Sequence, residues 1–247
     1  MKIPLATGLA SSALLVVSAA ARQAKPAAFF LAGDSTTATD GGWGDGFVAL
    51  LRNGAVGQNR GHSGATTASF VAGGDWAAVL DLVGRHTAAY DCYVTIQFGH
   101  NDQKPAAGIS MPQFQANLEA MARDVQRAGG TPVLLTSLTR RTFAADGVLE
   151  DSLADVSEAA RRAAAAVPGA ALLDLNAASR AYVQAIGPAA ADGYNLAPGD
   201  RTHLNPRGEA VFARVVADLL VGWRPALAEH VTPDPVMSGK IARGEVV

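Results

Sequence analysis

The sequence predicts an α/β fold in which a mostly parallel sheet is covered by helices on both faces. Short apolar runs alternate along the chain with segments of helical spacing, which is the pattern of such a fold. Turn-forming and chemically reactive residues follow several of these runs, as expected where ligands meet the carboxyl ends of parallel strands. The chain of 247 residues is long enough to bury one sizeable core.

The composition excludes several classes of protein. An apolar fraction of 49% and a net charge of only -2 argue against disorder. The balance of 20 basic and 22 acidic residues argues against a nucleic-acid-binding surface. The single cysteine, Cys92, cannot form an intrachain disulfide or a cysteine-based zinc cluster, and its apolar neighbours indicate a buried thiol.

The first 21 residues have the pattern of a secretory signal peptide. Lys2 precedes an apolar stretch, and the small residues 18–21 offer cleavage sites after Ala20 or Ala21. A membrane anchor is the alternative, but a span needs roughly 20 consecutive apolar residues and this stretch is shorter. We therefore expect a secreted or periplasmic protein with no membrane partner.

The first half of the chain contains three predicted strands and two predicted helices. The apolar run 27–32 stops at a glycine and predicts a buried strand, and a helix over about 47–52 ends at an Asn-Gly pair. A weak strand is expected at 55–58. The segment 92–98 predicts a stronger one, because it is rich in β-branched and aromatic residues. Ser110 and Gln113 predict a capping box for a helix that ends before Gly129.

The second half continues the alternation. Strands are predicted at 131–138 and 171–175, with a helix over about 152–166 between them. Asn205 followed by Pro206 predicts the start of a last helix with a continuous apolar face. We expect one domain over residues 22–222 and a peripheral tail at 223–247, which carries three prolines.

Two clusters of small and polar residues follow the first two strands. Ser35, within Gly33-Asp34-Ser35, can project its hydroxyl above the sheet, although such residues also serve as caps and turns. Gly64, in the loop after the second strand, allows the backbone to approach a ligand closely. We interpret His62 in that loop as an exposed turn residue and not as a catalytic base.

Two further clusters complete the pattern. Asn101, directly after the third strand, could aim its amide at a developing oxyanion, although Gly, Asn and Asp also form plain turns. Asp200 and His203 can point into one cleft, where the carboxylate would hold the imidazole in its working tautomer. On chemistry alone, Asp34 or Asp102 could also supply that carboxylate.

The four clusters together resemble the blocks of the SGNH/GDSL hydrolase superfamily. The nucleophile block is Gly33 to Ser35, the glycine block is Gly64, the G-x-N-D block is 99–102 and the D-x-x-H block is 200–203. The resemblance covers about residues 27–221. Its context is most similar to rhamnogalacturonan acetylesterases and related carbohydrate esterases, through the segments LAGDSTTA, GWG, FGHND and THLNPRG.

This resemblance implies a flavodoxin-like three-layer α/β/α sandwich with a five-stranded parallel sheet. It implies that Ser35 is the nucleophile, His203 the general base and acid, and Asp200 the orienting acid. The backbone N–H groups of Ser35 and Gly64 and the side chain of Asn101 would form the oxyanion hole. It implies neither a metal nor an organic cofactor.

The implied activity is a secreted serine esterase that removes acetyl groups from plant cell-wall polysaccharide, with rhamnogalacturonan or pectin as first expectation and xylan as second. The expected partner is an acetylated polysaccharide or oligosaccharide, bound by a monomer. Trp43 could stack on a sugar face, with a packing role as the equal alternative. A lipase or thioesterase of the same superfamily and a non-catalytic carbohydrate-binding protein remain the competing hypotheses.

Overall fold

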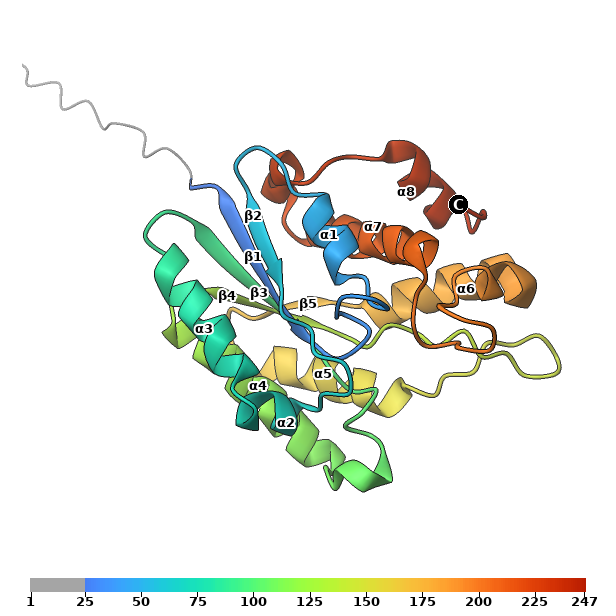
Figure 1. The fold of residues 1–247 in the computed structure, drawn as a ribbon, viewed down its shortest axis with the longest axis horizontal. Coiled ribbons are helices and arrows are strands. Elements are labelled where there is room, and N and C mark those ends of the chain that lie inside the picture. Colours follow the sequence, from blue (N-terminus) through green and yellow to red (C-terminus); the bar gives the residue numbers. More distant parts are fainter. Residues whose placement is uncertain (1–24) are drawn as a thin grey trace, which may run out of the picture.

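The computed structural model describes residues 25–247, so the predicted signal peptide lies outside the described residues. Five strands form one parallel sheet in the order β2-β1-β3-β4-β5 (Figure 1). Their bounds are β1 (Ala27–Gly33), β2 (Val56–Asn59), β3 (Asp91–Gln97), β4 (Thr131–Leu135) and β5 (Ala171–Leu173). This order is the flavodoxin-like one, so the predicted fold class is confirmed.

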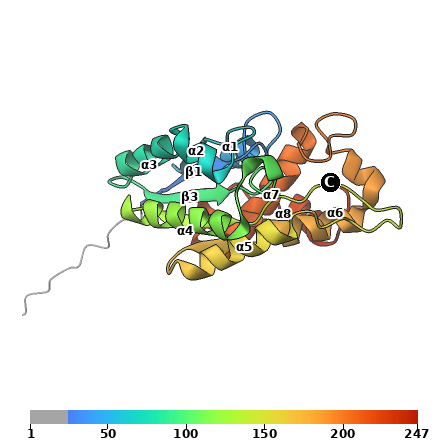
Figure 2. The same ribbon diagram turned by 90° about the horizontal axis from the view of Figure 1, so that it is seen from below.

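Helices cover both faces of the sheet (Figures 1 and 2). One layer contains α2 (Thr67–Ala72), α3 (Asp75–His86), α4 (Met111–Arg127) and α5 (Ala154–Ala166). The opposite layer contains α1 (Gly44–Ala49), α6 (Leu175–Asp192) and α7 (Pro206–Trp223). Successive β1 side chains point into opposite layers, Phe29 into the second and Phe30 into the first. β1 is therefore buried on both sides.

The register of the sheet brings loops from distant parts of the sequence to one edge. At the end of β1, Gly33 pairs with Gln97 at the end of β3. The loop after β2 is attached beside them, because the His62 N–H donates to the Gly33 carbonyl at 2.9 Å. The residues that follow β1, β2 and β3 thus meet at the carboxyl edge, where the sequence predicted the site.

Three helices of the two layers are absent from the sequence prediction. In α3, Trp76, Val79 and Val83 are buried at helical spacing, so the pattern was present in the sequence. In α6, the backbone at Gly187 is non-helical and Pro188 follows, which breaks the periodicity over the described helix. The third, α2, has only six residues and is too short for a periodic pattern.

Strand and cap details differ slightly from expectation. β4 ends at Leu135 rather than at residue 138, because its outer neighbour β5 is only three residues long. The side chain of Asn205 caps α7 as predicted, accepting from the Gly208 N–H at 2.9 Å. The capping box of α4 is only half formed, since the Gln113 side chain donates to Asn117 instead of returning to the cap.

The segment 223–247 packs on the domain rather than lying peripheral to it. It contains a short 3-10 helix, η2 (Pro225–His230), and α8 (Pro235–Ala242), both beside α7 (Figure 1). Leu227 and Val231 are buried in the core of the α7 layer. Leu51 and Val231 form an antiparallel bridge, which attaches the segment to the end of α1. The prediction of a peripheral tail is therefore wrong for its first half.

None of the helices within residues 25–247 combines the length and the apolar character needed to cross a membrane.

Candidate active site

Ser35 lies in a tight turn directly on the end of β1. Asp34 Oδ1 accepts hydrogen bonds from the Thr36 backbone N–H at 2.9 Å and from the Thr36 hydroxyl at 2.8 Å. The N–H groups of Thr37 and Ala38 both donate to the Asp34 carbonyl at 3.0 Å. These bonds fix the backbone on either side of Ser35, whose side chain remains partly exposed.

Asp200 and His203 lie in the connection between α6 and α7. Asp200 contacts His203, and His203 contacts Ser35. His203 Nδ1 lies 2.9 Å from Asp200 Oδ2, and His203 Nε2 lies 2.9 Å from Ser35 Oγ. Burial acts to raise the pKa of Asp200, but the backbone N–H and imidazole of His203 outweigh it and lower that pKa. An ionised carboxylate, an imidazole and a hydroxyl connected this way can activate the hydroxyl as a nucleophile.

The two other carboxylates that the sequence left open are engaged elsewhere. Asp34 is fully buried, with Oδ2 3.6 Å from His100 Nδ1. Asp102 is also fully buried, and its Oδ1 accepts from the Thr67 N–H at 2.8 Å and the Thr67 hydroxyl at 2.6 Å. Burial raises the pKa of Asp102, whose role in this structure is to anchor the first turn of α2. Of the three candidates, Asp200 is the one in contact with His203.

The serine turn and the loops after β2 and β3 each contribute one candidate oxyanion donor. Within residues 25–247, the backbone N–H groups of Ser35 and Gly64 have no hydrogen-bond acceptor. Asn101 Nδ2 donates to the Ala65 carbonyl at 2.9 Å, which leaves its second N–H free, and Asn101 Oδ1 accepts from Lys104 Nζ at 2.7 Å. Because an ammonium group only donates, Lys104 fixes which end of the amide carries the donors.

The Gly64 loop requires a glycine and is attached to the start of α3. Gly64 has a φ of +81°, in the left-handed region that other residues rarely adopt. His62 is exposed, as interpreted from the sequence, and its Nδ1 lies 2.7 Å from Asp75 Oδ2 at the start of α3. His62 therefore attaches its loop to α3, and no hydrogen bond joins it to Ser35 in the described part of the chain.

The prediction that Trp43 stacks on a sugar is wrong, and the packing alternative holds. The Trp43 side chain is completely buried, so neither face of its ring is available. Its indole N–H donates to Gln97 Oε1 at 2.6 Å, and Gln97 Nε2 in turn donates to the Thr36 hydroxyl. Since Thr36 also donates to Asp34, Trp43 ends a buried hydrogen-bond chain that supports the nucleophile turn.

Arg141 is a site residue that the sequence prediction missed. Its side chain is fully buried, with Nε donating to Asn195 Oδ1 at 2.7 Å and Nη2 to the His203 carbonyl at 2.6 Å. Its backbone N–H donates to the Arg201 carbonyl at 2.9 Å. Burial lowers the pKa of Arg141 to about 10, against the opposing charge of Asp200. The arginine thus holds the loop that carries Asp200 and His203, from a position no local motif marks.

In the part of the chain that the structure describes, no group of three or more His, Cys, Asp and Glu side chains is arranged to hold a metal ion. Cys92 is a free, buried thiol, as predicted, and burial raises its pKa.

A flavodoxin-like sandwich with a Ser-His-Asp hydrogen-bond relay at the carboxyl edge is the arrangement of a serine hydrolase. The sequence profile of the GDSL-like Lipase/Acylhydrolase family matches residues 31–211, so the chain belongs to this family. The resemblance to SGNH/GDSL hydrolases is confirmed, and the protein is an enzyme, an ester hydrolase of that family.

The relatives cover most of the chain. The rhamnogalacturonan acetylesterase RhgT of Bacillus subtilis (strain 168) is 33% identical over 226 residues, covering 84% of this chain and 95% of its own. The crystal structure of YxiM from Bacillus subtilis aligns with a TM-score of 0.70 and 25% identity, covering 83% of this chain. This chain spans only 58% of that longer YxiM chain.

A more distant structure shares the fold. The acetylxylan esterase Axe2 from Geobacillus stearothermophilus aligns with a TM-score of 0.57 and 16% identity, over 81% of this chain and 94% of its own. At that identity the likeness extends to the architecture alone.

Proposed function

We propose that the protein is a carbohydrate esterase that removes acetyl groups from rhamnogalacturonan through a serine acyl-enzyme. The observation that carries this proposal is the continuous set of hydrogen bonds from Ser35 through His203 to Asp200. The choice of substrate is supported by the 33% identity to RhgT, which is named as a rhamnogalacturonan acetylesterase.

In the first half of the reaction, Ser35 Oγ attacks the acetyl carbonyl while His203 Nε2 takes the hydroxyl proton. Asp200 stabilises the imidazolium that results and keeps the ring in place. The N–H groups of Ser35 and Gly64 and the free N–H of Asn101 stabilise the tetrahedral oxyanion. The imidazolium then returns its proton to the departing sugar oxygen, and the acetyl group stays on Ser35.

In the second half, water attacks the acetyl-enzyme while His203 Nε2 accepts one of its protons. The second tetrahedral intermediate uses the same three donors. Its collapse releases acetate, and the histidine returns the proton to Ser35 Oγ. The cycle is balanced, because one ester and one water give one alcohol and one acetic acid.

The proposal is tested by acetate release from acetylated rhamnogalacturonan and from acetylated xylan. We expect release from rhamnogalacturonan, and we expect Ser35→Ala to lower kcat by roughly 10⁶ because the nucleophile is removed. The matched control is Ser238→Ala on α8, remote from the carboxyl edge, which should retain wild-type turnover. Retained activity in Ser35→Ala would overturn the mechanism.

The substrate arms separate the competing hypotheses. Serine-dependent release from xylan alone would move the substrate and leave the mechanism standing. A maximum on long-chain p-nitrophenyl esters would indicate a lipase or thioesterase instead. Binding of the polysaccharides without any release would indicate a carbohydrate-binding protein.

We also propose that residues 1–21 direct export and that the mature protein acts as a monomer outside the cytoplasm. The basic residue, apolar stretch and small residues of this segment support export. The mass of the protein recovered from the periplasm or medium would identify cleavage after Ala20 or Ala21. Light scattering on that sample would give its oligomeric state.

A further inference from the structure

Basic side chains on the outer helices mostly form ion pairs, whereas two basic side chains at the carboxyl edge form none within the described residues. On the helices most arginines are paired with carboxylates, as Arg85 is with Asp81 at 2.6 Å. Lys104 and Arg140 differ, because neither has a carboxylate within ion-pair distance among residues 25–247. They follow β3 and β4, which are neighbours in the sheet, so both lie at the edge that carries the relay.

Lys104 contacts the site directly. Its Nζ donates to Asn101 Oδ1 at 2.7 Å, and the rest of its side chain is exposed. An ammonium group has three donors, so the Asn101 contact leaves two of them for other acceptors. A positive charge therefore lies beside a candidate oxyanion donor, on the side open to solvent.

Arg140 lies beside the loop that carries the histidine. The next residue, Arg141, bonds through its backbone N–H to Arg201, so this segment runs alongside residues 200–203. The Arg140 guanidinium is half-buried, and its one side-chain hydrogen bond in the described chain goes from Nη1 to Ser152 Oγ at 3.2 Å. Burial lowers the pKa of Arg140, and the charge of Asp34 acts in the opposite direction.

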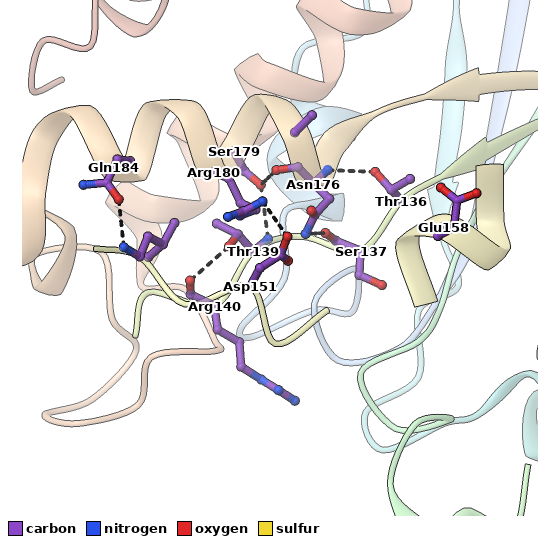
Figure 3. Close-up of polar contacts among 12 residues, drawn as sticks. Thr136, Ser137, Thr139, Arg140, Asp151, Glu158, Asn176, Ser179, Arg180 and Gln184 are labelled. Carbon is purple, nitrogen blue, oxygen red and sulfur yellow. Dashed lines mark hydrogen bonds and ion pairs between the residues drawn. The ribbon is translucent and has the colours of Figure 1, made fainter. Parts of the chain in front are cut away.

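The backbone that carries Arg140 is held in place by α6 (Figure 3). Asn176 Nδ2 donates to the Ser137 carbonyl at 3.0 Å, and the Thr139 N–H donates to Ser179 Oγ at 3.1 Å. The Arg140 side chain points away from Asn176 and Ser179, on the opposite side of the segment (Figure 3). The guanidinium is therefore presented from a fixed backbone.

The chain offers Arg140 no carboxylate of its own. Asp34 is fully buried and bonded to Thr36, and Asp200 is bonded to His203. A half-buried guanidinium has lost part of its hydration free energy, and without an anion this loss is not fully offset. A carboxylate that binds to it would offset the loss. The planar guanidinium matches a carboxylate with two parallel hydrogen bonds.

We propose that Arg140, assisted by Lys104, binds the carboxylate of a uronic acid residue next to the acetylated sugar. This inference rests on the proposed function, because it places an acidic sugar of the rhamnogalacturonan chain close to the acetyl group that Ser35 attacks. A neutral polysaccharide such as unsubstituted xylan offers no such anion. Arg140 is thus a specificity residue that distinguishes acidic from neutral acetylated polymers.

The test compares acetylated rhamnogalacturonan with the same polymer after its carboxyl groups are reduced to alcohols. The wild-type protein is expected to show a higher kcat/KM on the acidic polymer. In Arg140→Gln this preference should fall by roughly 10- to 100-fold, mainly through KM, since one charged hydrogen-bonding group is lost. The control, Arg85→Gln, removes an exposed arginine from α3 and should retain the preference.

A binding experiment keeps the inference separate from the proposed function. In the Ser35→Ala background, de-esterified oligogalacturonide should bind by calorimetry, more weakly at high salt, and Arg140→Gln should abolish that binding. Equal activity of the wild type on both polymers, or no oligogalacturonide binding, would overturn the role of Arg140 alone. Absence of serine-dependent acetate release from either polymer, with oligogalacturonide still bound, would overturn the esterase proposal and leave the carboxylate site intact.

Discussion

The serine and the histidine of this site are held by two different kinds of structure. Ser35 follows β1, an interior strand that is buried on both faces, and its turn is closed by hydrogen bonds among residues 34–38. His203 is 168 positions away, in a connection between two helices, and is held by the buried side chain of Arg141. A residue on a strand end inherits its position from the sheet, whereas a residue in a long connection needs an anchor from elsewhere in the chain.

Among the residues that support Ser35 and His203, the largest effect should come from the carboxylate in the histidine loop. Asp200→Asn is expected to lower kcat on p-nitrophenyl acetate by about 10⁴, because an amide favours the wrong imidazole tautomer. The unfolding temperature should change little, since the Asp200 side chain is partly exposed. A kcat within about tenfold of wild type would remove Asp200 from the relay and reopen the roles of Asp34 and Asp102.

The donor contributed by the third strand should matter less. Asn101→Ala is expected to lower kcat by roughly 10²–10³ through the loss of one oxyanion donor. Because the ester is bound before the oxyanion forms, KM should stay close to wild type. Steady-state kinetics on the same ester check both values, and an unchanged kcat would exclude Asn101 from the oxyanion hole.

The anchor of the histidine loop is expected to have an intermediate effect. Arg141→Lys keeps the charge, but one ammonium group cannot donate along both directions that reach Asn195 and His203. Unpaired buried acceptors should lower the free energy of unfolding by about 1–3 kcal/mol. Misplacement of His203 should lower kcat by up to about 10².

The control for this anchor is Arg123→Lys, an exposed arginine paired with Glu119 on α4, which should change neither quantity. Urea denaturation and esterase kinetics on the two variants measure the comparison. Equal behaviour of the two would show that the histidine loop keeps its position without Arg141.

The smallest expected effect is a pH dependence of the free energy of unfolding that arises from Asp34 in the nucleophile turn. Burial acts to raise the pKa of Asp34, but the imidazole of His100, 3.6 Å away, and the hydrogen bonds from Thr36 outweigh it, so that pKa lies below its ordinary value of 3.8. The unfolded chain therefore binds a proton more readily than the folded one. Ionised Asp34 stabilises the fold above about pH 4, and this contribution is lost as the pH falls through the lower folded pKa.

Urea midpoints measured from about pH 6 down to about pH 3 test this expectation. Asp34→Asn should flatten the acid side of the profile more than Asp200→Asn does, because Asp34 is fully buried and Asp200 is partly exposed. Profiles of equal steepness in wild type and Asp34→Asn would contradict the lowered pKa.

Most of the sheet and the contiguous blocks of the site could be predicted because their information is local. Apolar runs predict the strands, and the segment Gly33 to Ser35 predicts both the end of a strand and a serine hydroxyl placed directly after it. The cap at Asn205 is equally local. Helix α6 was not predicted, since Gly187 and Pro188 interrupt the helical spacing of its apolar residues.

The supporting residues could not be predicted, because their role depends on partners that are distant in sequence. Arg141 acts on a carbonyl 62 positions later, and Trp43 donates to Gln97, 54 positions later. Nothing near either residue in the sequence indicates those partners. The complete burial of Trp43 excludes stacking on a sugar and supports the packing role, and burial is known only from the folded structure.

The bridge between Leu51 and Val231 also has a consequence for how the protein is made. Val231 lies in the segment that covers the end of α1, and the Thr232 N–H donates to the Leu50 carbonyl at 2.7 Å. Contacts of such long sequence separation form late, after a large loss of chain entropy. The end of α1 is therefore covered only after residues beyond 230 have been synthesised and have packed against it.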